Sequence, residues 1–119
     1  MEVILDTSFI LNCLKVGIDF LEAVEYGKVV IAREVVEELG KLAQDNSKLA
    51  EQAKLALEII ERNKVKMIKL NSGHVDAGII KYVRNKQVIV ATMDSELKRK
   101  LKKKSKLLII RGKKKLELE

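Results

Sequence analysis

Short, continuous aliphatic runs recur along this sequence and constrain its fold more than any other feature. They are VIL at 3–5, VVIA at 29–32, VIVA at 88–91 and LLII at 107–110. Runs without polar alternation are typical of strands that are covered on both faces, as in parallel sheets. Because helical patterns separate these runs, the sequence predicts an α/β fold with a mostly parallel central sheet and helices on both faces.

The segments between the runs carry apolar residues at helical spacing. One helix shows Val35, Leu39 and Leu42 on one face, and others are expected at about 47–62, from 71–73 onward, and from 95 to about 103. VKMI at 65–68 predicts a short strand, and the final KLELE predicts an edge strand. No linker or internal repeat divides the 119 residues, which predicts a single domain over 1–119.

The composition disfavours several classes of protein. No apolar run approaches the roughly 20 residues of a membrane span, and a predicted strand stands where a signal peptide would begin. Cys13 is the only cysteine, which excludes an intramolecular disulfide and suits a reducing compartment. We therefore expect a cytoplasmic protein without membrane contact. Leu11, Leu14 and Phe20 fit a homodimer contact and core packing equally well.

Basic residues gather toward the C-terminal end. Residues 98–115 hold eleven Lys or Arg and no acid, whereas residues 1–97 hold thirteen basic and fifteen acidic residues. This basic segment therefore accounts for the whole net charge of +7. Such a segment favours a polyanionic partner, most often nucleic acid. The alternative is a solvated, lysine-rich surface of the kind common in heat-stable proteins.

Two acids stand at the ends of predicted strands. Asp6 directly follows the first aliphatic run, and Asp94 comes just after VIVAT. Ligands of open α/β sheets bind outside the carboxyl ends of the strands, so parallel strands would place both carboxylates on the same rim. For either acid alone, a helix N-cap is the plainer explanation.

Two further acids fall on or beside apolar helix faces. Glu38 lies on, or at the edge of, the apolar stripe of its helix, while Glu37 points the other way with Glu34 and Lys41. Asp76 precedes a run of apolar positions at helical spacing. A carboxylate on such a face is costly unless it is paired or bound to metal. A salt bridge to lysine, or for Asp76 the helix dipole, is the plainer explanation.

Four acids from four separate segments make a more specific pattern than any one of them. Carboxylates held close together repel one another unless a cation joins them. No cluster of His or Cys suggests zinc, and ligands that are all oxygen suit Mg²⁺ or Mn²⁺. Beside a basic surface, such a cluster fits metal-assisted cleavage of phosphodiesters.

The sequence resembles PIN-domain nucleases over essentially its whole length. The matching pieces are LDTS at 5–8, VVEEL at 35–39, the acid of HVDAGII at 74–80, and VATMDSELKRKL at 90–101. The last piece and its continuation most resemble PIN proteins that process precursor ribosomal RNA in archaea and eukaryotes. The resemblance implies a three-layer α/β/α sandwich, and a Mg²⁺- or Mn²⁺-dependent endoribonuclease whose partner is RNA.

The resemblance also implies roles for individual residues. The family's acidic motif falls on Asp6, Glu38, Asp76 and Asp94, as catalytic groups and metal ligands, with Glu96 as a further metal ligand. Three hydroxyls would support the carboxylates, although turn and cap roles explain them equally well: Thr7, Ser8 and Thr92. Three cations would bind RNA phosphates near the site: Lys98, Arg99 and Lys102. The ribosomal RNA branch usually has a second acid where this chain has Ala77, a departure that bears on a second metal.

Two other functions keep the same fold. Small PIN nucleases also act as toxins that a partner antitoxin restrains, and the basic segment favours ribosomal RNA processing over that role. The second alternative is an RNA-binding module with a degenerate site; the four acids argue against it and Ala77 argues faintly for it. A phosphoacceptor receiver domain needs an acidic pair on its first strand and an acceptor on a middle strand, and the sequence has neither.

Overall fold

The computed structural model describes residues 1–112 and 114–119. A six-stranded sheet forms its centre, in the order β3-β2-β1-β4-β5-β6. The strands are β1 (Glu2–Leu5), β2 (Lys28–Ala32), β3 (Lys66–Ile68), β4 (Val88–Ala91), β5 (Lys106–Arg111) and β6 (Lys115–Leu118). Neighbouring strands are parallel except β5 and β6, which are antiparallel. The predicted mostly parallel sheet is therefore confirmed.

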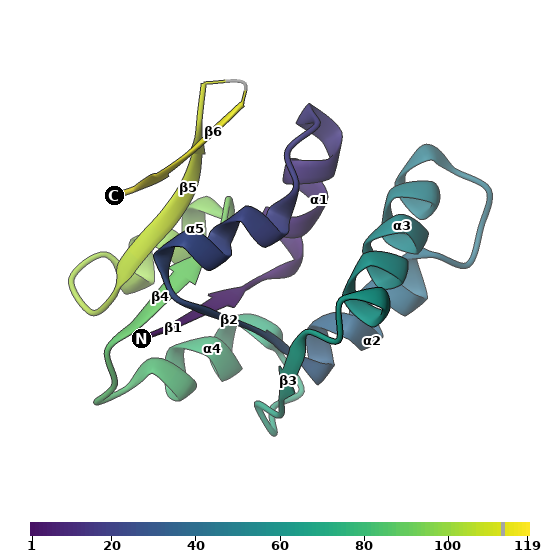
Figure 1. The fold of residues 1–119 in the computed structure, drawn as a ribbon. Coiled ribbons are helices and arrows are strands. Elements are labelled where there is room, and N and C mark those ends of the chain that lie inside the picture. The colour runs from purple at the N-terminus through teal and green to yellow at the C-terminus, as the bar shows by residue number, and fades with distance from the viewer. Residues whose placement is uncertain (113) are drawn as a thin grey trace.

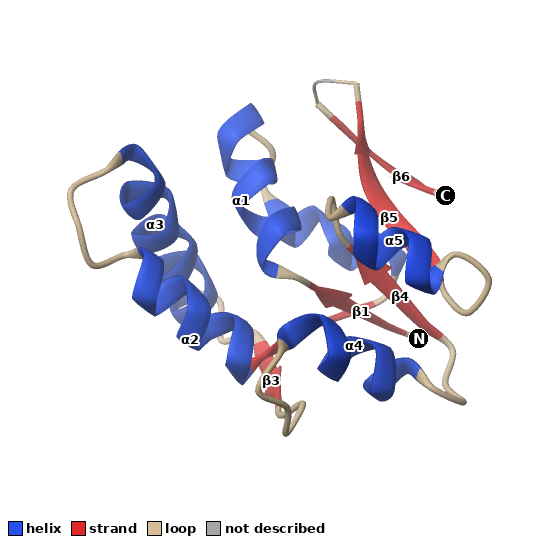
Figure 2. Cartoon of the chain, turned by 180° about the vertical axis from the view of Figure 1, so that it is seen from behind, coloured by secondary structure: helices blue, strands red, loops and turns tan. Residues whose placement is uncertain are grey.

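Helices cover both faces of the sheet, as the sequence predicted (Figure 1). They are α1 (Thr7–Val16), α2 (Arg33–Leu42), α3 (Lys48–Arg62), α4 (Val75–Val83) and α5 (Ser95–Leu101), with a 3₁₀-helix η1 at Phe20–Tyr26. The first three helices pack against one another, and α4 and α5 pack together on the face turned toward the viewer in Figure 2. Right-handed connections between parallel strands explain this division. The chain moves one way along the sheet from β1 to β2 and β3, and the opposite way from β3 to β4 and β5. The helices of these two sets of connections therefore lie on opposite faces.

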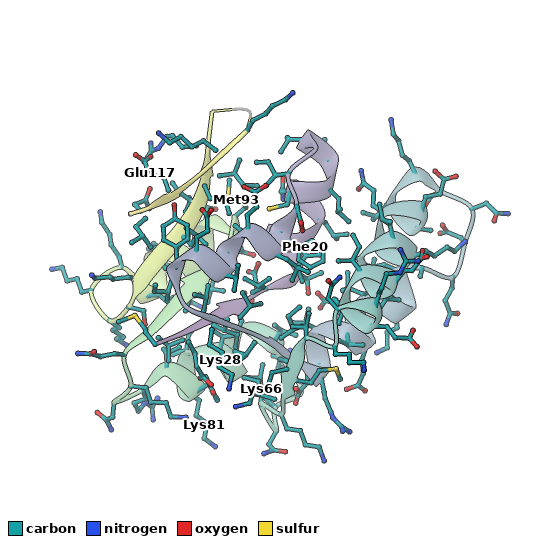
Figure 3. The ribbon with its side chains drawn as sticks, viewed as in Figure 1. Phe20, Lys28, Lys66, Lys81, Met93 and Glu117 are labelled. Carbon is teal, nitrogen blue, oxygen red and sulfur yellow. The ribbon has the colours of Figure 1, made fainter. Side chains whose placement is uncertain are left out.

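The core lies between the sheet and its helical layers. Every residue of β4 is buried, as are Val3, Ile4 and Leu5 of β1. Phe20 is also buried, in the layer between the sheet and the helices (Figure 3). Leu11 and Leu14 of α1 pack against the same core while staying partly exposed, and a homodimer contact through these side chains stays a prediction.

Some predicted boundaries differ from those observed. The helix expected from 71–73 begins at Val75, because Asn71 has a left-handed φ of 55° and the Ser72 hydroxyl accepts a hydrogen bond from the His74 amide. The basic helix ends at Leu101, about two residues early. The sequence pattern gave no sign of η1. In the part of the chain that the structure describes, no helix is long and apolar enough to cross a membrane.

The strand order produces a crevice where β1 and β4 lie side by side. From β1 the chain builds the sheet toward β2 and β3, and from β4 it builds toward β5 and β6 in the opposite direction. The connections therefore leave the carboxyl ends of β1 and β4 on opposite faces. Open α/β sheets bind their ligands at such a point. Asp6 and Asp94 follow these two strand ends.

Candidate active site

A pocket of about 960 Å³ opens at the carboxyl edge of the sheet. Four acids from four segments line it: Asp6 after β1, Glu38 on α2, Asp76 on α4 and Asp94 after β4. None of the ion pairs formed by the described residues involves any of the four. The structure therefore brings together the four acids that the sequence singled out, and lysines do not neutralise them one by one.

Asp6 is the most constrained of the four acids. It is buried, and its Oδ1 atom caps α1 by accepting hydrogen bonds from the Phe9 amide and the Ser8 hydroxyl, both at 2.8 Å. Its Oδ2 atom accepts a hydrogen bond from the Thr92 hydroxyl. Burial raises the pKa of Asp6 to about 6, although these three hydrogen bonds act in the opposite direction.

Two hydroxyls connect the ends of β1 and β4 through Asp6. The Ser8 hydroxyl also accepts a hydrogen bond from the Met93 amide at 3.0 Å, and the Thr92 hydroxyl accepts one from the Asp94 amide at 3.0 Å. Thr92 is completely buried. These contacts are those that a supporting role for Ser8 and Thr92 requires, and the role itself stays a prediction. The network fixes the carboxylate of Asp6 relative to the backbone that carries Asp94.

Asp76 and Asp94 face the same space from α4 and α5. The Asp94 carboxylate caps α5, because its Oδ1 atom accepts a hydrogen bond from the Leu97 amide at 3.0 Å. Asp76 is half-buried in the first turn of α4. Burial raises the pKa of Asp76, and the negative charges of Asp94, Glu38 and Glu96 raise it further, while the positive charge of Lys100 acts in the opposite direction. The charges of these acids therefore act on one another across the pocket.

Helix α2 borders the pocket with its polar face. Glu34, Glu37, Glu38 and Lys41 all line the pocket, at the i, i+3, i+4, i+7 spacing of one helix face. Glu37, Glu34 and Lys41 thus lie off the apolar stripe, as the sequence predicted, and the face that they form borders the pocket, which the sequence did not predict. Glu38 is exposed, and it lies where the polar face meets the apolar stripe rather than inside the core. The sequence gives this spacing but not the direction in which the polar face points.

Glu34 ties α2 to the loop before Asp76. Its two carboxylate oxygens accept hydrogen bonds from the backbone amides of Leu70 at 3.0 Å and Asn71 at 2.9 Å. The hydrogen bond from Leu70 is the main cause that lowers the pKa of Glu34. The loop leads directly into α4. Glu34 therefore helps to fix the start of this helix, which carries Asp76. Sequence reasoning missed this residue, whose signal was its place on the polar face of α2.

The cations are arranged differently from the prediction. Lys41 and Lys100 line the pocket, and neither was predicted. Lys98 and Arg99 lie on α5 but do not line the pocket, and Lys102 lies beyond the far end of that helix. The expected position of Lys102 near the acids is therefore wrong, because α5 leads the chain away from the carboxyl edge. RNA binding by these three residues stays a prediction.

Glu96 stands apart from the other acids. It is exposed on α5, outside the lining of the pocket, and its Oε1 atom lies 3.5 Å from Lys100 Nζ and 3.8 Å from Arg99 Nη2. Its charge nevertheless raises the pKa of Asp76. The contacts of Glu96 are thus those of a surface ion pair, and metal binding by Glu96 stays a prediction.

The donor atoms of the pocket suit a hard divalent cation. They are carboxylate oxygens, and the buried Thr7 hydroxyl beside them has no hydrogen-bond partner among the described residues. Across residues 1–112 and 114–119, no three His, Cys, Asp or Glu side chains stand close enough together to hold an ion as they are oriented. Both oxygens of Asp6 and one of Asp94 already accept hydrogen bonds. Oxygen donors of this kind fit Mg²⁺ or Mn²⁺ by their chemistry.

Two known proteins are similar to this chain over almost its whole length. The chain is 29% identical over 125 residues to Ribonuclease VapC4 of Methanocaldococcus jannaschii, with 98% of this chain and 95% of that protein covered. It is similar to a solved structure described as that of the PIN domain endonuclease Utp24, with a TM-score of 0.81, 28% identity, and coverage of 99% of this chain and 90% of that one. The family model described as "PIN like domain" matches residues 3–113, so this chain belongs to the PIN-like domain family.

Proposed function

We propose that this protein is a metal-dependent endoribonuclease that hydrolyses phosphodiester bonds of RNA in the carboxyl-edge pocket. The observation that carries the proposal is the meeting of Asp6, Glu38, Asp76 and Asp94 in one pocket at the crevice between β1 and β4. The similarity to a ribonuclease and to a PIN domain endonuclease, each over at least 98% of this chain, supports the same activity.

Three acids would hold Mg²⁺ or Mn²⁺, directly or through water: Asp6, Asp76 and Asp94. Glu38 would ligate a second ion or orient the attacking water. A bound divalent ion lowers the pKa of water and offsets negative charge on the scissile phosphate. Ser8 and Thr92 would hold the Asp6 carboxylate in place through the hydrogen bonds described above.

The lysines that line the pocket would hold the phosphate of the substrate. Lys41 on α2 and Lys100 on α5 belong to different helices of the pocket wall. Phosphate contacts of this kind position the strand without reading its sequence. The acids of the pocket would thus hold the metal ion and the attacking water, and the lysines would hold the RNA strand.

The biological role that we favour is ribosomal RNA processing, and its support is the basic segment 98–115. A toxin of a toxin–antitoxin pair is the second candidate. The two relatives match at 29% and 28% identity and therefore do not decide between these roles. An RNA-binding module without activity is the third candidate, and the experiment below separates it from both nucleases.

The decisive experiment compares cleavage of structured and single-stranded RNA in Mn²⁺, in Mg²⁺ and in EDTA. Asp6→Asn and Asp94→Asn should each lose cleavage by more than the roughly 10- to 100-fold that loss of an outer-shell partner costs. Asp19→Asn is the matched control, because Asp19 also caps a helix but is exposed and lies outside the pocket. Cleavage that persists in EDTA or in Asp6→Asn contradicts the proposal, and RNA binding without cleavage supports the binding module.

A further inference from the structure

A second hollow, of about 430 Å³, lies at the amino edge of the sheet, opposite the acidic pocket. The turns that lead into β4 and β5 meet there beside the start of β1. Five lysines line it, which we name the amino-edge lysine cluster: Lys86, Lys102, Lys103, Lys104 and Lys106. The remaining lining residues are Met1, Gln87, Val88 and Ser105, so no acid contributes to this hollow.

Among the residues that the structure describes, no acid pairs with the lysines of the cluster. All five are exposed, and none of the ion pairs formed by the described residues includes them. Glu2 lies at the same edge, but it accepts a hydrogen bond from the Tyr82 hydroxyl and lies 4.0 Å from Lys66. Lys86 Nζ sits 3.9 Å from the centre of the Tyr82 ring, which holds it in place without offsetting its charge.

The amino ends of other strands extend this positive surface. Lys28 and Lys66 are the first residues of β2 and β3, and both side chains are exposed. Like charges gathered this closely repel one another, and a polyanion that binds over them relieves the repulsion. Lysines rather than apolar or aromatic side chains make up most of the hollow, which favours phosphate over a membrane or a protein as the partner.

Helix α5 joins the two charged edges. Asp94 caps its start in the acidic pocket, and Lys102 follows its last turn in the cluster. Its seven residues span only about 10 Å. Lys98, Arg99 and Lys100 lie along the helix between the two edges. A strand whose scissile phosphate sits among the acids could therefore follow α5 and reach the cluster with its neighbouring phosphates.

We infer that the amino-edge lysine cluster binds the phosphate backbone of the RNA substrate, at nucleotides beyond the bond that is cut. This inference deepens the proposed nuclease function and rests on it for the identity of the polyanion. The cluster would supply affinity that depends strongly on salt and little on base sequence. RNA too short to reach from the acidic pocket to the cluster would gain nothing from these lysines.

The test neutralises three lysines at the amino edge and three elsewhere. Lys102→Gln, Lys103→Gln and Lys104→Gln form the cluster variant, and Lys15→Gln, Lys48→Gln and Lys54→Gln form the control. All six lysines are exposed, and both variants lower the net charge from +7 to +4. Binding of a labelled single-stranded RNA is measured by fluorescence anisotropy in EDTA across a salt series, and cleavage is measured separately in Mn²⁺.

The cluster variant should bind long RNA more weakly than the control. The slope of log K against log salt should be smaller by about 2, since each lost contact to a single strand contributes about 0.7. Cleavage of RNA too short to reach the cluster should match the control. Equal slopes in the two variants would overturn the inference, and so would cluster-dependent binding to vesicles of anionic lipid with RNA binding unchanged.

The two proposals fail in different ways. If the wild type cuts RNA in Mn²⁺ but both variants bind alike, the lysine cluster is refuted and the nuclease stands. If the wild type never cuts RNA but the cluster variant loses RNA binding, the nuclease is refuted and the lysine cluster stands as an RNA-binding surface.

Discussion

The two edges of the central sheet carry opposite charge. In the part of the chain that the structure describes, charged side chains are fixed by hydrogen bonds at one edge and exposed without ion pairs at the other. At the carboxyl edge, Asp6 and Asp94 each accept hydrogen bonds from the backbone, and Asp6 is buried. At the amino edge, the lysines of the cluster are exposed and make no ion pair among the described residues. Fixed charges suit chemistry that depends on geometry, whereas free charges suit a flexible polyanion of varying sequence.

The direction of the helices explains why the charges separate. Each helix that follows a parallel strand begins at the carboxyl edge, where its free amides favour an acid, as at Asp6 and Asp94. The same helices end toward the amino edge, where the dipole favours cations, as at the end of α5 (Figure 2). The fold therefore stabilises acids at one edge and lysines at the other before any function is considered.

The contrast between a buried acid at one edge and exposed lysines at the other predicts its largest effect on stability. In the absence of metal, the free energy of unfolding should depend on pH through Asp6. The pKa of Asp6 rises from 3.8 to about 6 on folding, mainly through burial. The protonated Asp6 therefore contributes about 3 kcal/mol to the free energy of unfolding. This contribution is fully present below pH 3.8 and is lost as the pH rises through 6. About half of that loss is expected between pH 5 and 7.5. The measurement is urea unfolding in EDTA at these two values.

A pair of variants isolates the contribution of Asp6. Asp6→Asn should lose stability by less than the wild type between pH 5 and 7.5, because the amide does not titrate. Asp19→Asn makes the same chemical change at an exposed cap and should behave like the wild type. If wild type and Asp6→Asn lose the same stability over this range, the carboxylate is not held in the buried state described here.

The second expected effect is on catalysis through the buried hydroxyl network. Thr92→Val keeps the volume of the side chain but removes the hydroxyl that donates to Asp6 and accepts from the Asp94 amide. Cleavage should fall by about 10- to 100-fold, and more Mn²⁺ should be needed for half of the maximal rate. The readout is the cleavage rate against Mn²⁺ concentration at fixed RNA.

Ser105→Ala is the control at the other edge. The Ser105 hydroxyl is buried, has no hydrogen-bond partner among the described residues, and lies beside the lysine cluster. Its removal should leave the cleavage rate and the Mn²⁺ requirement unchanged. Equal losses of cleavage rate in Thr92→Val and Ser105→Ala would mean that Thr92 acts only through general stability. The hydroxyl network at the carboxyl edge would then have no special role in catalysis.

The sequence predicted the acidic edge better than the basic one, for a physical reason. Asp6 and Asp94 follow buried strands directly, so knowing that the strands are parallel is enough to bring them to one edge. Glu34 and Glu37 were placed on the polar face of α2, but not beside the pocket, since helix periodicity shows which residues share a face but not what that face meets. That direction depends on how α2 packs against its neighbours, which is a tertiary property.

The error at Lys102 has a similar origin. The basic residues after Asp94 were expected near the acids because they are close to them in sequence. A helix of seven residues moves the chain about 10 Å along its axis, which is enough to carry Lys102 to the other edge. The early end of α5 and the 3₁₀-helix η1 also depend on packing that no local pattern reports. Proximity in sequence was informative at strand ends and misleading along a helix.

The smallest effect that we expect is that of a single lysine of the cluster. Lys103→Gln should weaken binding of long single-stranded RNA by about threefold or less and lower the salt slope by about 0.7, because the remaining lysines still face the strand. The measurement is the anisotropy titration used for the triple variant. A tenfold loss from this one change would mean that Lys103 holds a single phosphate in a fixed position, as the acids at the other edge are held, and the amino edge would then be a specific site rather than an adaptable surface.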